Sequence, residues 1–205
     1  SALTLVVVTI VYIASGLLFF WLARSRGFAI AVLAGAAAAG MAGLALAAPQ
    51  QCHQETQYFC LRVEDLSADP SSPVHLMVID HLAHGISARD APEVQFTVHG
   101  AMLDTLTRLR APREEYSTYV IGGGSFSVPR SLMAQGAGPM TVAEIDPEVT
   151  RLAEEAFWFD ASAAEIWHED ARRALLIRPE REFDIIIGDA FTDVVVPVHL
   201  VTREF

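Results

Sequence analysis

The chain has 205 residues, of which 52% are hydrophobic and 19% are charged, and its net charge is −11. Nucleic acid is excluded as an expected partner, because contacts to phosphates require a basic surface. The mean hydropathy of +0.34 is too high for an ordinary soluble domain, so part of the chain must be apolar for a reason other than core formation.

Two charge-free runs at the start of the sequence, residues 3–23 and 28–48, account for this excess. At ~1.5 Å per residue, each run is long enough to cross a hydrocarbon core of ~30 Å. The first residues carry no basic segment, which argues against a cleaved signal peptide. We therefore predict a transmembrane helical hairpin over residues 1–48, with membrane lipid as a partner and the bacterial inner membrane as the expected location.

The second run carries small residues every four positions, at Gly35, Ala39 and Gly43. This spacing places them on one face of a helix, where another helix can approach closely. The partner is either the first helix or another transmembrane subunit, and the sequence fits both.

Residues 49–113 are predicted to form a β-hairpin and a helix region. Segments 58–63 and 74–79 have the composition of strands and are separated by a turn-rich segment. A helix is expected over residues 92–109, with Val94, Val98, Met102 and Leu106 on one face. Cys52 and Cys60 lie near the start of this region, after the second apolar run. They form either a disulfide, on an oxidising side of the membrane, or two reduced thiols.

Residues 114–205 alternate short apolar strands with helices, which predicts a parallel sheet covered on both faces. The expected strands are 119–121, 140–143, 165–167 and 183–187, and the expected helices are 128–135, 147–157 and 171–177. The predicted fold class is thus α/β, with a Rossmann-like parallel sheet, an N-terminal β-hairpin and two transmembrane helices. Four strands are few for such a sheet, so either the protein continues past Phe205 or the sheet is unusually small.

The first of these strands runs into Gly122, Gly123 and Gly124, a turn in which the backbone can approach a ligand closely. The second strand ends at Glu144, whose carboxylate can accept hydrogen bonds from two ribose hydroxyls. Asp146 is better placed to cap the helix that starts at Pro147.

Acidic residues also follow the third and fourth strands, at Asp170 and Asp189, and ligands of open α/β sheets bind at this edge. The ordered motifs YVIGGG, VAEIDPEV, HEDARRALL, FDIIIGDAF and VPVHLVTREF resemble the spermidine synthase family, whose fold is of the class I methyltransferase type. The resemblance covers roughly residues 55–205. Segments 124–130 and 197–205 look most like the membrane-fused branch of that family.

The resemblance implies a nucleoside site and an amine site. Gly122, Gly123, Gly124, Glu144, Asp170 and Ala171 would bind the donor, which is S-adenosylmethionine or its decarboxylated form. Asp189 would be the catalytic acid that orients and deprotonates a small cationic amine, the acceptor of an aminopropyl group. Further substrate contacts would come from Tyr58, Asp80 and Asp193. No metal site is expected, although Asp80, His81, His84 and His99 are candidates by residue type.

Departures from the family pattern keep a second function open. Ser125 stands where the soluble enzymes place an aspartate that holds the nucleoside's amino group, and Phe126 and Ser127 replace glycines. In the segments around Tyr58 and Asp80, further residues also differ from those that are usual in the family. The alternative is a catalytically degenerate subunit of a membrane complex that uses the fold as a docking domain.

The side of the membrane on which the C-terminal region lies is left open by two opposing arguments. Arg24 and Arg26, between the apolar runs, favour a cytoplasmic turn and place the remainder on the opposite face. A sulfonium nucleoside is made in the cytoplasm, however, so an active enzyme should face it. The first argument suits a docking subunit, and the second suits an enzyme.

Overall fold

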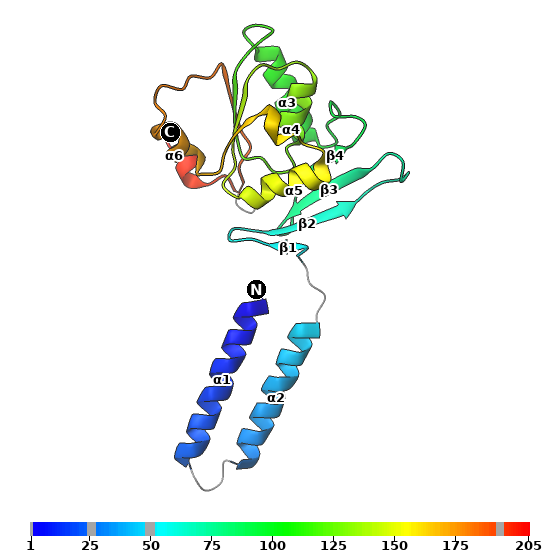
Figure 1. Ribbon diagram of the computed structural model, residues 1–205. Coiled ribbons are helices and arrows are strands. Elements are labelled where there is room, and N and C mark those ends of the chain that lie inside the picture. Colours follow the sequence, from blue (N-terminus) through cyan, green and yellow to red (C-terminus); the bar gives the residue numbers. More distant parts are fainter. Residues whose placement is uncertain (1, 24–27, 48–51, 192–194) are drawn as a thin grey trace. The chain divides into compact units, whose positions relative to one another are not determined.

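The computed structural model describes residues 2–23, 28–47, 52–191 and 195–205 (Figure 1). The chain divides into two compact units, one ending at Gln50 and one beginning at Gln51.

The first unit consists of two helices, α1 (Ala2–Ala23) and α2 (Phe28–Ala47), which lie side by side (Figure 1). Both predicted helices are therefore confirmed as helices, and the turn with Arg24 and Arg26 lies outside the described residues. In the described portions of these helices and of the rest of the chain, no helix has both the length and the apolarity needed to cross a membrane. The predicted transmembrane hairpin, and with it the membrane-fused branch, is not supported.

The small-residue face of α2 has space around it. An added Cβ at Gly35 or at Gly43 would meet no described atom within 4 Å, and Ala39 is exposed. The described part of α1 therefore does not pack closely on this face. The role of the face in binding another helix stays a prediction.

The second unit begins with an antiparallel sheet in the order β1-β2-β3-β4. Its strands are β1 (Gln54–Glu55), β2 (Cys60–Asp65), β3 (Val74–Ile79) and β4 (Leu82–Ala88). The predicted hairpin corresponds to β2 and β3, which pair antiparallel. Strand β4 was missing from the prediction because only Asp80 and His81 separate it from β3, so no conspicuous turn segment marks its start.

A parallel sheet follows, in the order β7-β6-β5-β8. Its strands are β5 (Thr118–Ile121), β6 (Met140–Ala143), β7 (Glu165–Trp167) and β8 (Ile185–Gly188). The helices of this unit are α3 (Val98–Arg110), α4 (Ser127–Ala134), α5 (Pro147–Phe157) and α6 (Ala171–Leu176), with short 3-10 turns at Ala161–Ala163 and Val198–Leu200. The predicted α/β class and the parallel sheet are confirmed.

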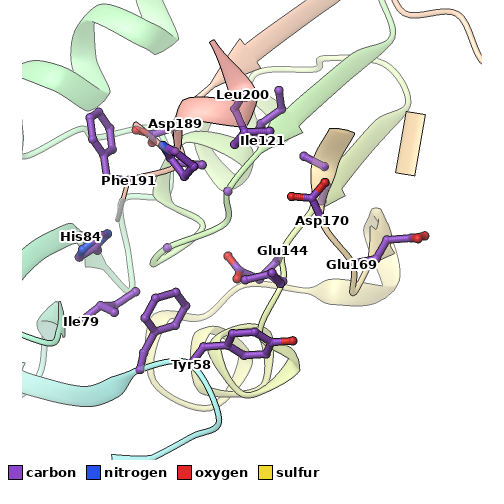
Figure 2. A pocket seen from close by; sticks show the side chains of 18 of the residues that line it. Tyr58, Ile79, His84, Ile121, Glu144, Glu169, Asp170, Asp189, Phe191 and Leu200 are labelled. Carbon is purple, nitrogen blue, oxygen red and sulfur yellow. The ribbon is translucent and has the colours of Figure 1, made fainter. Parts of the chain in front are cut away.

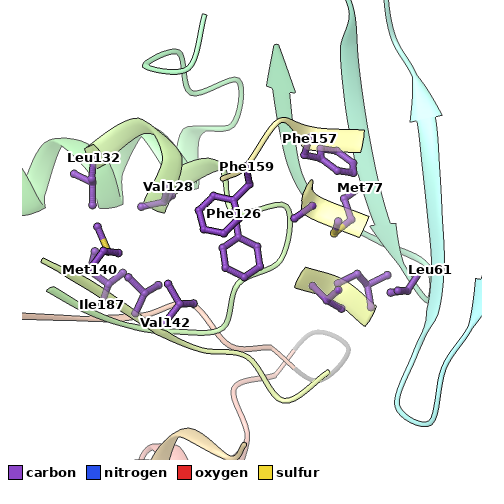
Figure 3. Close-up of a cluster of buried hydrophobic side chains, with 14 residues drawn as sticks. Leu61, Met77, Phe126, Val128, Leu132, Met140, Val142, Phe157, Phe159 and Ile187 are labelled. Carbon is purple, nitrogen blue, oxygen red and sulfur yellow. The ribbon is translucent and has the colours of Figure 1, made fainter. Parts of the chain in front are cut away.

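Alternate residues of the parallel strands enter two different cores, because successive side chains of a strand point to opposite faces. On one face, Val120, Val142 and Ile187 pack with residues of α4 and α5 (Figure 3). On the other face, Tyr119 and Ile121 form a separate cluster that includes residues of α6. The sheet is thus covered on both sides, as its uniformly apolar strands predicted.

The apolar face predicted for α3 points to solvent. The side chains of Val98 and Leu106 are 79% and 51% exposed, whereas Asp104 is buried on the same helix. Asp104 accepts hydrogen bonds from Ser131 Oγ at 3.0 Å and Gln135 Nε2 at 3.1 Å. Helix α3 is therefore attached to α4 through polar contacts, and hydrophobic periodicity identified the helix but not its buried side.

The antiparallel sheet packs against α5, and this contact positions the functional site. Leu61 of β2 and Met77 of β3 are fully buried in the same core as Val149 and Phe157 of α5 (Figure 3). The hydroxyl Oγ1 of Thr56 also donates a hydrogen bond to the carboxylate of Asp146, the N-cap residue of α5. The loop between β1 and β2 is thereby held next to the carboxyl edge of the parallel sheet.

Candidate active site

A cavity of about 330 Å³ lies at the carboxyl edge of the parallel sheet (Figure 2). Glycines of the turn after β5 form one wall, and the β1–β2 loop forms another. Figure 2 shows Glu144 between two groups of side chains, with Glu169 and Asp170 on one side and His84, Asp189 and Phe191 on the other. Residues far apart in the sequence are thus brought to one site.

Two of the three glycines in the turn after β5 have a backbone conformation that favours glycine. Gly122 and Gly124 have φ values of +91° and +52°, which residues with a Cβ rarely adopt. A Cβ added at Gly122 would lie 2.6 Å from the carbonyl oxygen of Asp189, and one added at Gly124 would lie 2.9 Å from the carbonyl oxygen of His84. Gly122 and Gly124 both line the cavity, whereas Gly123 contributes its backbone N–H to Glu144.

Glu144 is a buried carboxylate held by backbone amides. Its Oε2 accepts from the N–H of Gly123 at 2.8 Å and its Oε1 from the N–H of Asp146 at 2.9 Å. Burial raises the pKa of Glu144, while these hydrogen bonds to the ionised form partly oppose the rise. A carboxylate fixed in this way has lone pairs left to accept hydroxyl hydrogen bonds inside the cavity.

Asp146 caps α5, as the sequence predicted. Its Oδ1 accepts from the backbone N–H of Glu148 at 3.0 Å, and Pro147 occupies the first helical position. The adjacent carboxylates Glu144 and Asp146 therefore have different roles, one facing the cavity and the other stabilising the helix.

Asp146→Ala is expected to lower the free energy of unfolding by about 1–2 kcal/mol, because the helix loses its cap and Thr56 loses its acceptor. Asp146→Asn keeps an oxygen at the same place and should lose much less. Chemical denaturation of the full chain measures both. Equal losses in the two variants would contradict a capping role.

Asp170 and Ala171 lie where α6 begins, on the far side of the cavity from Asp189. Asp170 Oδ1 accepts from the backbone N–H of Arg173 at 2.9 Å, and its Oδ2 lies 2.6 Å from His199 Nε2. Burial alone would raise the pKa of Asp170, but the hydrogen bonds from Arg173 and His199 outweigh it, so the pKa is lowered. His199 was not predicted as a site residue, although it lies within the motif VPVHLVTREF.

Asp189 follows β8 and lies where the first cavity meets a second one of about 320 Å³. Its Oδ1 is 2.6 Å from Nε2 of His99. Burial raises the pKa of Asp189, and the nearby imidazoles of His99 and His84 oppose this rise. These three side chains form an ionisable group that sequence reasoning did not assemble, because it considered the histidines only as metal ligands.

The remaining predicted substrate residues are placed differently from one another. Tyr58 lines the cavity, together with Phe59. Asp80 lies in the β3–β4 turn with φ of +57°, and its Oδ1 accepts from the backbone N–H of Cys60 at 2.9 Å, outside the cavity wall. Asp193 lies outside the described residues.

Ser125 and Phe126 show what the departures from the family pattern do. Ser125 is fully buried, its Oγ has no hydrogen-bond partner among the described residues, and an added Cβ at Gly85 would lie 2.0 Å from it. Phe126 has φ of +55°, so it keeps a backbone conformation that suits glycine, and its ring stacks on Phe159 at a centroid distance of 4.3 Å. Neither side chain lines the cavity at the carboxyl edge of the parallel sheet.

Cys52 and Cys60 form a disulfide, with their Cα atoms 5.3 Å apart. Of the two alternatives left open by the sequence, the structure contains the bonded form. The bond closes the loop that presents Tyr58 and Phe59 to the cavity. In the part of the chain that the structure describes, no group of three or more histidine, cysteine or acidic side chains is arranged to hold a metal ion.

Comparisons with known proteins gave matches in sequence and in fold. Over 118 residues the chain is 33% identical to the polyamine aminopropyltransferase of Vibrio vulnificus (strain CMCP6), a match that covers 56% of this chain and 37% of that protein. The chain therefore spans well under half the length of this relative. No protein-family model matches.

Solved structures with similar folds include a probable spermidine synthase from Corynebacterium glutamicum ATCC 13032, with a TM-score of 0.59 and 24% identity. That match covers 74% of this chain and 56% of the other. A spermidine synthase in complex with the transition state analogue AdoDATO matches with a TM-score of 0.49 and 21% identity, covering 76% of this chain and 60% of that one. In sequence the chain is thus similar to a polyamine aminopropyltransferase, and in fold it is similar to a spermidine synthase.

Proposed function

We propose that this protein binds an S-adenosyl sulfonium nucleoside and transfers its aminopropyl group to a small amine. The observation that carries the proposal is the placement of Glu144, Asp170 and Asp189 around one cavity beside a glycine turn. Ligands of open α/β sheets bind at this edge. The sequence similarity to a polyamine aminopropyltransferase supports the choice of reaction.

Each carboxylate has a distinct task in the proposed complex. Glu144 accepts hydrogen bonds from the ribose hydroxyls, and Asp170 with Ala171 contacts the adenine. Asp189 orients the amine that attacks the carbon next to the sulfonium sulfur. The reaction removes the positive charge on sulfur, so the protein mainly has to position the two reactants and provide for the amine proton.

Titration calorimetry with S-adenosylmethionine, its decarboxylated form and methylthioadenosine tests the donor site. We expect the decarboxylated form and methylthioadenosine to bind, followed by transfer when an amine is added. Absence of heat with all three nucleosides would remove the nucleoside site from the proposal. Binding without transfer to any amine would favour the second function below.

The second function is a docking subunit of a membrane complex, and Ser125 is the observation that favours it. In the soluble enzymes the corresponding position holds an aspartate for the nucleoside's amino group, but Ser125 is buried away from the cavity. Transfer activity separates the two functions. Aminopropyl transfer by the parent protein to a small amine supports the enzyme, and nucleoside binding without transfer to any amine supports docking.

We further propose that α1 and α2 hold the protein at a membrane, with lipid and other transmembrane subunits as partners. The support is the sequence, in which residues 3–23 and 28–48 carry no charge. Sedimentation of the full chain with lipid vesicles tests this. A chain that stays in solution without detergent would contradict it.

The thiols of Cys52 and Cys60 report the side on which the second unit lies. A disulfide persists on an oxidising side of the membrane, so the bonded pair favours that side. An impermeant thiol reagent applied to intact cells tests the side. Labelling that appears only after reduction would place the second unit outside and count against the transferase. Labelling that requires cell lysis would place the second unit in the cytoplasm, which the availability of the donor favours.

A further inference from the structure

Asp189 is paired with a second ionisable side chain, His99 of α3. Nε2 of His99 lies 2.6 Å from Oδ1 of Asp189, and the imidazole ring packs edge-on against Phe191 with a centroid distance of 5.8 Å. A carboxylate on one side and an aromatic ring on the other hold this imidazole in place. The roles that the resemblance implies give His99 no part in the reaction.

His99 and Asp189 differ in the cavities that they face. Asp189 lines both the nucleoside cavity and the second cavity, together with His84, Gly124 and Phe191. His99 lines only the second cavity. With the donor in the first cavity, an amine that approaches Asp189 from the second one meets His99.

We propose that His99 accepts the proton of the attacking amine, while Asp189 orients the imidazole and stabilises the imidazolium that forms. This inference rests on the proposed aminopropyl transfer and assigns one of its steps to a residue. The Nε2–H of His99 donates to Oδ1 of Asp189, which leaves the lone pair of Nδ1 to accept a proton.

The step balances without any further reactant. The ammonium of the bound amine first gives a proton to Nδ1 of His99. The neutral amine nitrogen then forms a bond to the carbon next to the sulfonium, the bond from that carbon to sulfur breaks, and its electron pair returns to sulfur. The products are a neutral thioether and a secondary ammonium, and the imidazolium later releases its proton to water.

An imidazole suits this task better than a carboxylate alone. Its ordinary pKa is about 2.6 units above that of an aspartic acid, so it holds the transferred proton more firmly near neutral pH. Two further ionisable groups lie near the pair, namely His84 of β4 and, next to His84, Asp80. Burial lowers the pKa of His84, although both acids oppose the shift, so this imidazole adds little positive charge to the pair.

The test compares the full-length parent protein with His99→Gln, using decarboxylated S-adenosylmethionine as donor and 1,4-diaminobutane or n-butylamine as acceptor. Glutamine keeps a donor for Asp189 but accepts no proton near neutral pH. We expect kcat to fall about 100-fold or more, while nucleoside affinity and the amine KM change less than about threefold. His81→Gln is the matched control, because His81 is exposed and lies outside both cavities.

A His99→Gln variant that keeps more than a third of the parental kcat would overturn the inference. So would a loss of activity in His84→Gln that is as large as that in His99→Gln, or one that His81→Gln shares. If glutamine lowers the thermal stability of the domain, His99→Asn takes its place. If the parent protein binds the nucleoside but transfers its aminopropyl group to neither amine, the proposed function and this inference are both overturned.

Discussion

Asp189→Asn is expected to reduce aminopropyl transfer by about 10²–10⁴-fold while nucleoside affinity stays within about tenfold. The amide has the size of the carboxylate but lacks its charge, so it neither attracts an ammonium nor stabilises a protonated His99. The affinity for the donor falls little, because Glu144 and Asp170 provide the donor's main polar contacts in the proposed complex.

Single-turnover transfer from the decarboxylated nucleoside, together with titration calorimetry, separates the two effects of Asp189→Asn. Asp69→Asn is the matched control, since Asp69 is an exposed carboxylate whose Oδ1 accepts from Ser71 N–H at 2.8 Å, far from the cavity lining. Equal turnover by Asp189→Asn and the parent would remove Asp189 from the mechanism. A parallel loss in Asp69→Asn would show that the assay reports stability and not catalysis.

Glu144→Ala is expected to weaken nucleoside binding by about 1–3 kcal/mol, which is roughly 5–150-fold in affinity. Two causes contribute. The ribose hydroxyls lose a charged acceptor, and the backbone N–H groups of Gly123 and Asp146 lose the partner that fixes the glycine turn. Glu144→Gln retains an acceptor oxygen without the charge, so its loss should be smaller.

Titration with methylthioadenosine measures the effect of Glu144→Ala without any need for transfer. Glu154→Ala provides the control, because Glu154 is exposed on α5. Burial raises the pKa of Glu144 above its usual 4.5, so the ionised form is lost at a higher pH than for an exposed glutamate. Affinity of the parent should therefore decline as the pH falls toward that raised pKa, and this decline should be absent in Glu144→Ala. An unchanged affinity in Glu144→Ala would place the nucleoside elsewhere.

The order of secondary structure in the second unit could be predicted because each element carries its own local signal. Helix α5 begins and ends at the predicted residues, since Asp146 and Pro147 form a start signal that depends on neighbouring residues alone. The strands β6 and β7 were also predicted at their observed bounds, since they are short apolar or aromatic runs between turns. The carboxyl edge as the place for Glu144, Asp170 and Asp189 followed from the geometry of parallel strands.

The sequence could not predict contacts between side chains of elements that are distant along the chain. No pattern indicates that His99 meets Asp189 or that His199 meets Asp170, because each contact joins residues from elements whose separation depends on the packing of the whole domain. For the same reason, the exposed face of α3 could not be distinguished from a buried one.

The sequence by itself determined the α/β class, the parallel sheet, the glycine turn and the edge at which the carboxylates gather, because these follow from local periodicity and from residues with special backbone conformations. Only the tertiary structure decided which carboxylates face the cavity, which bind backbone amides, and which pair with histidines. Asp80 illustrates the difference, since its carboxylate accepts a hydrogen bond from the N–H of Cys60 in the antiparallel sheet and does not line the cavity. The physical reason is that a side chain's partner depends on distances across the folded chain, which local propensities do not encode.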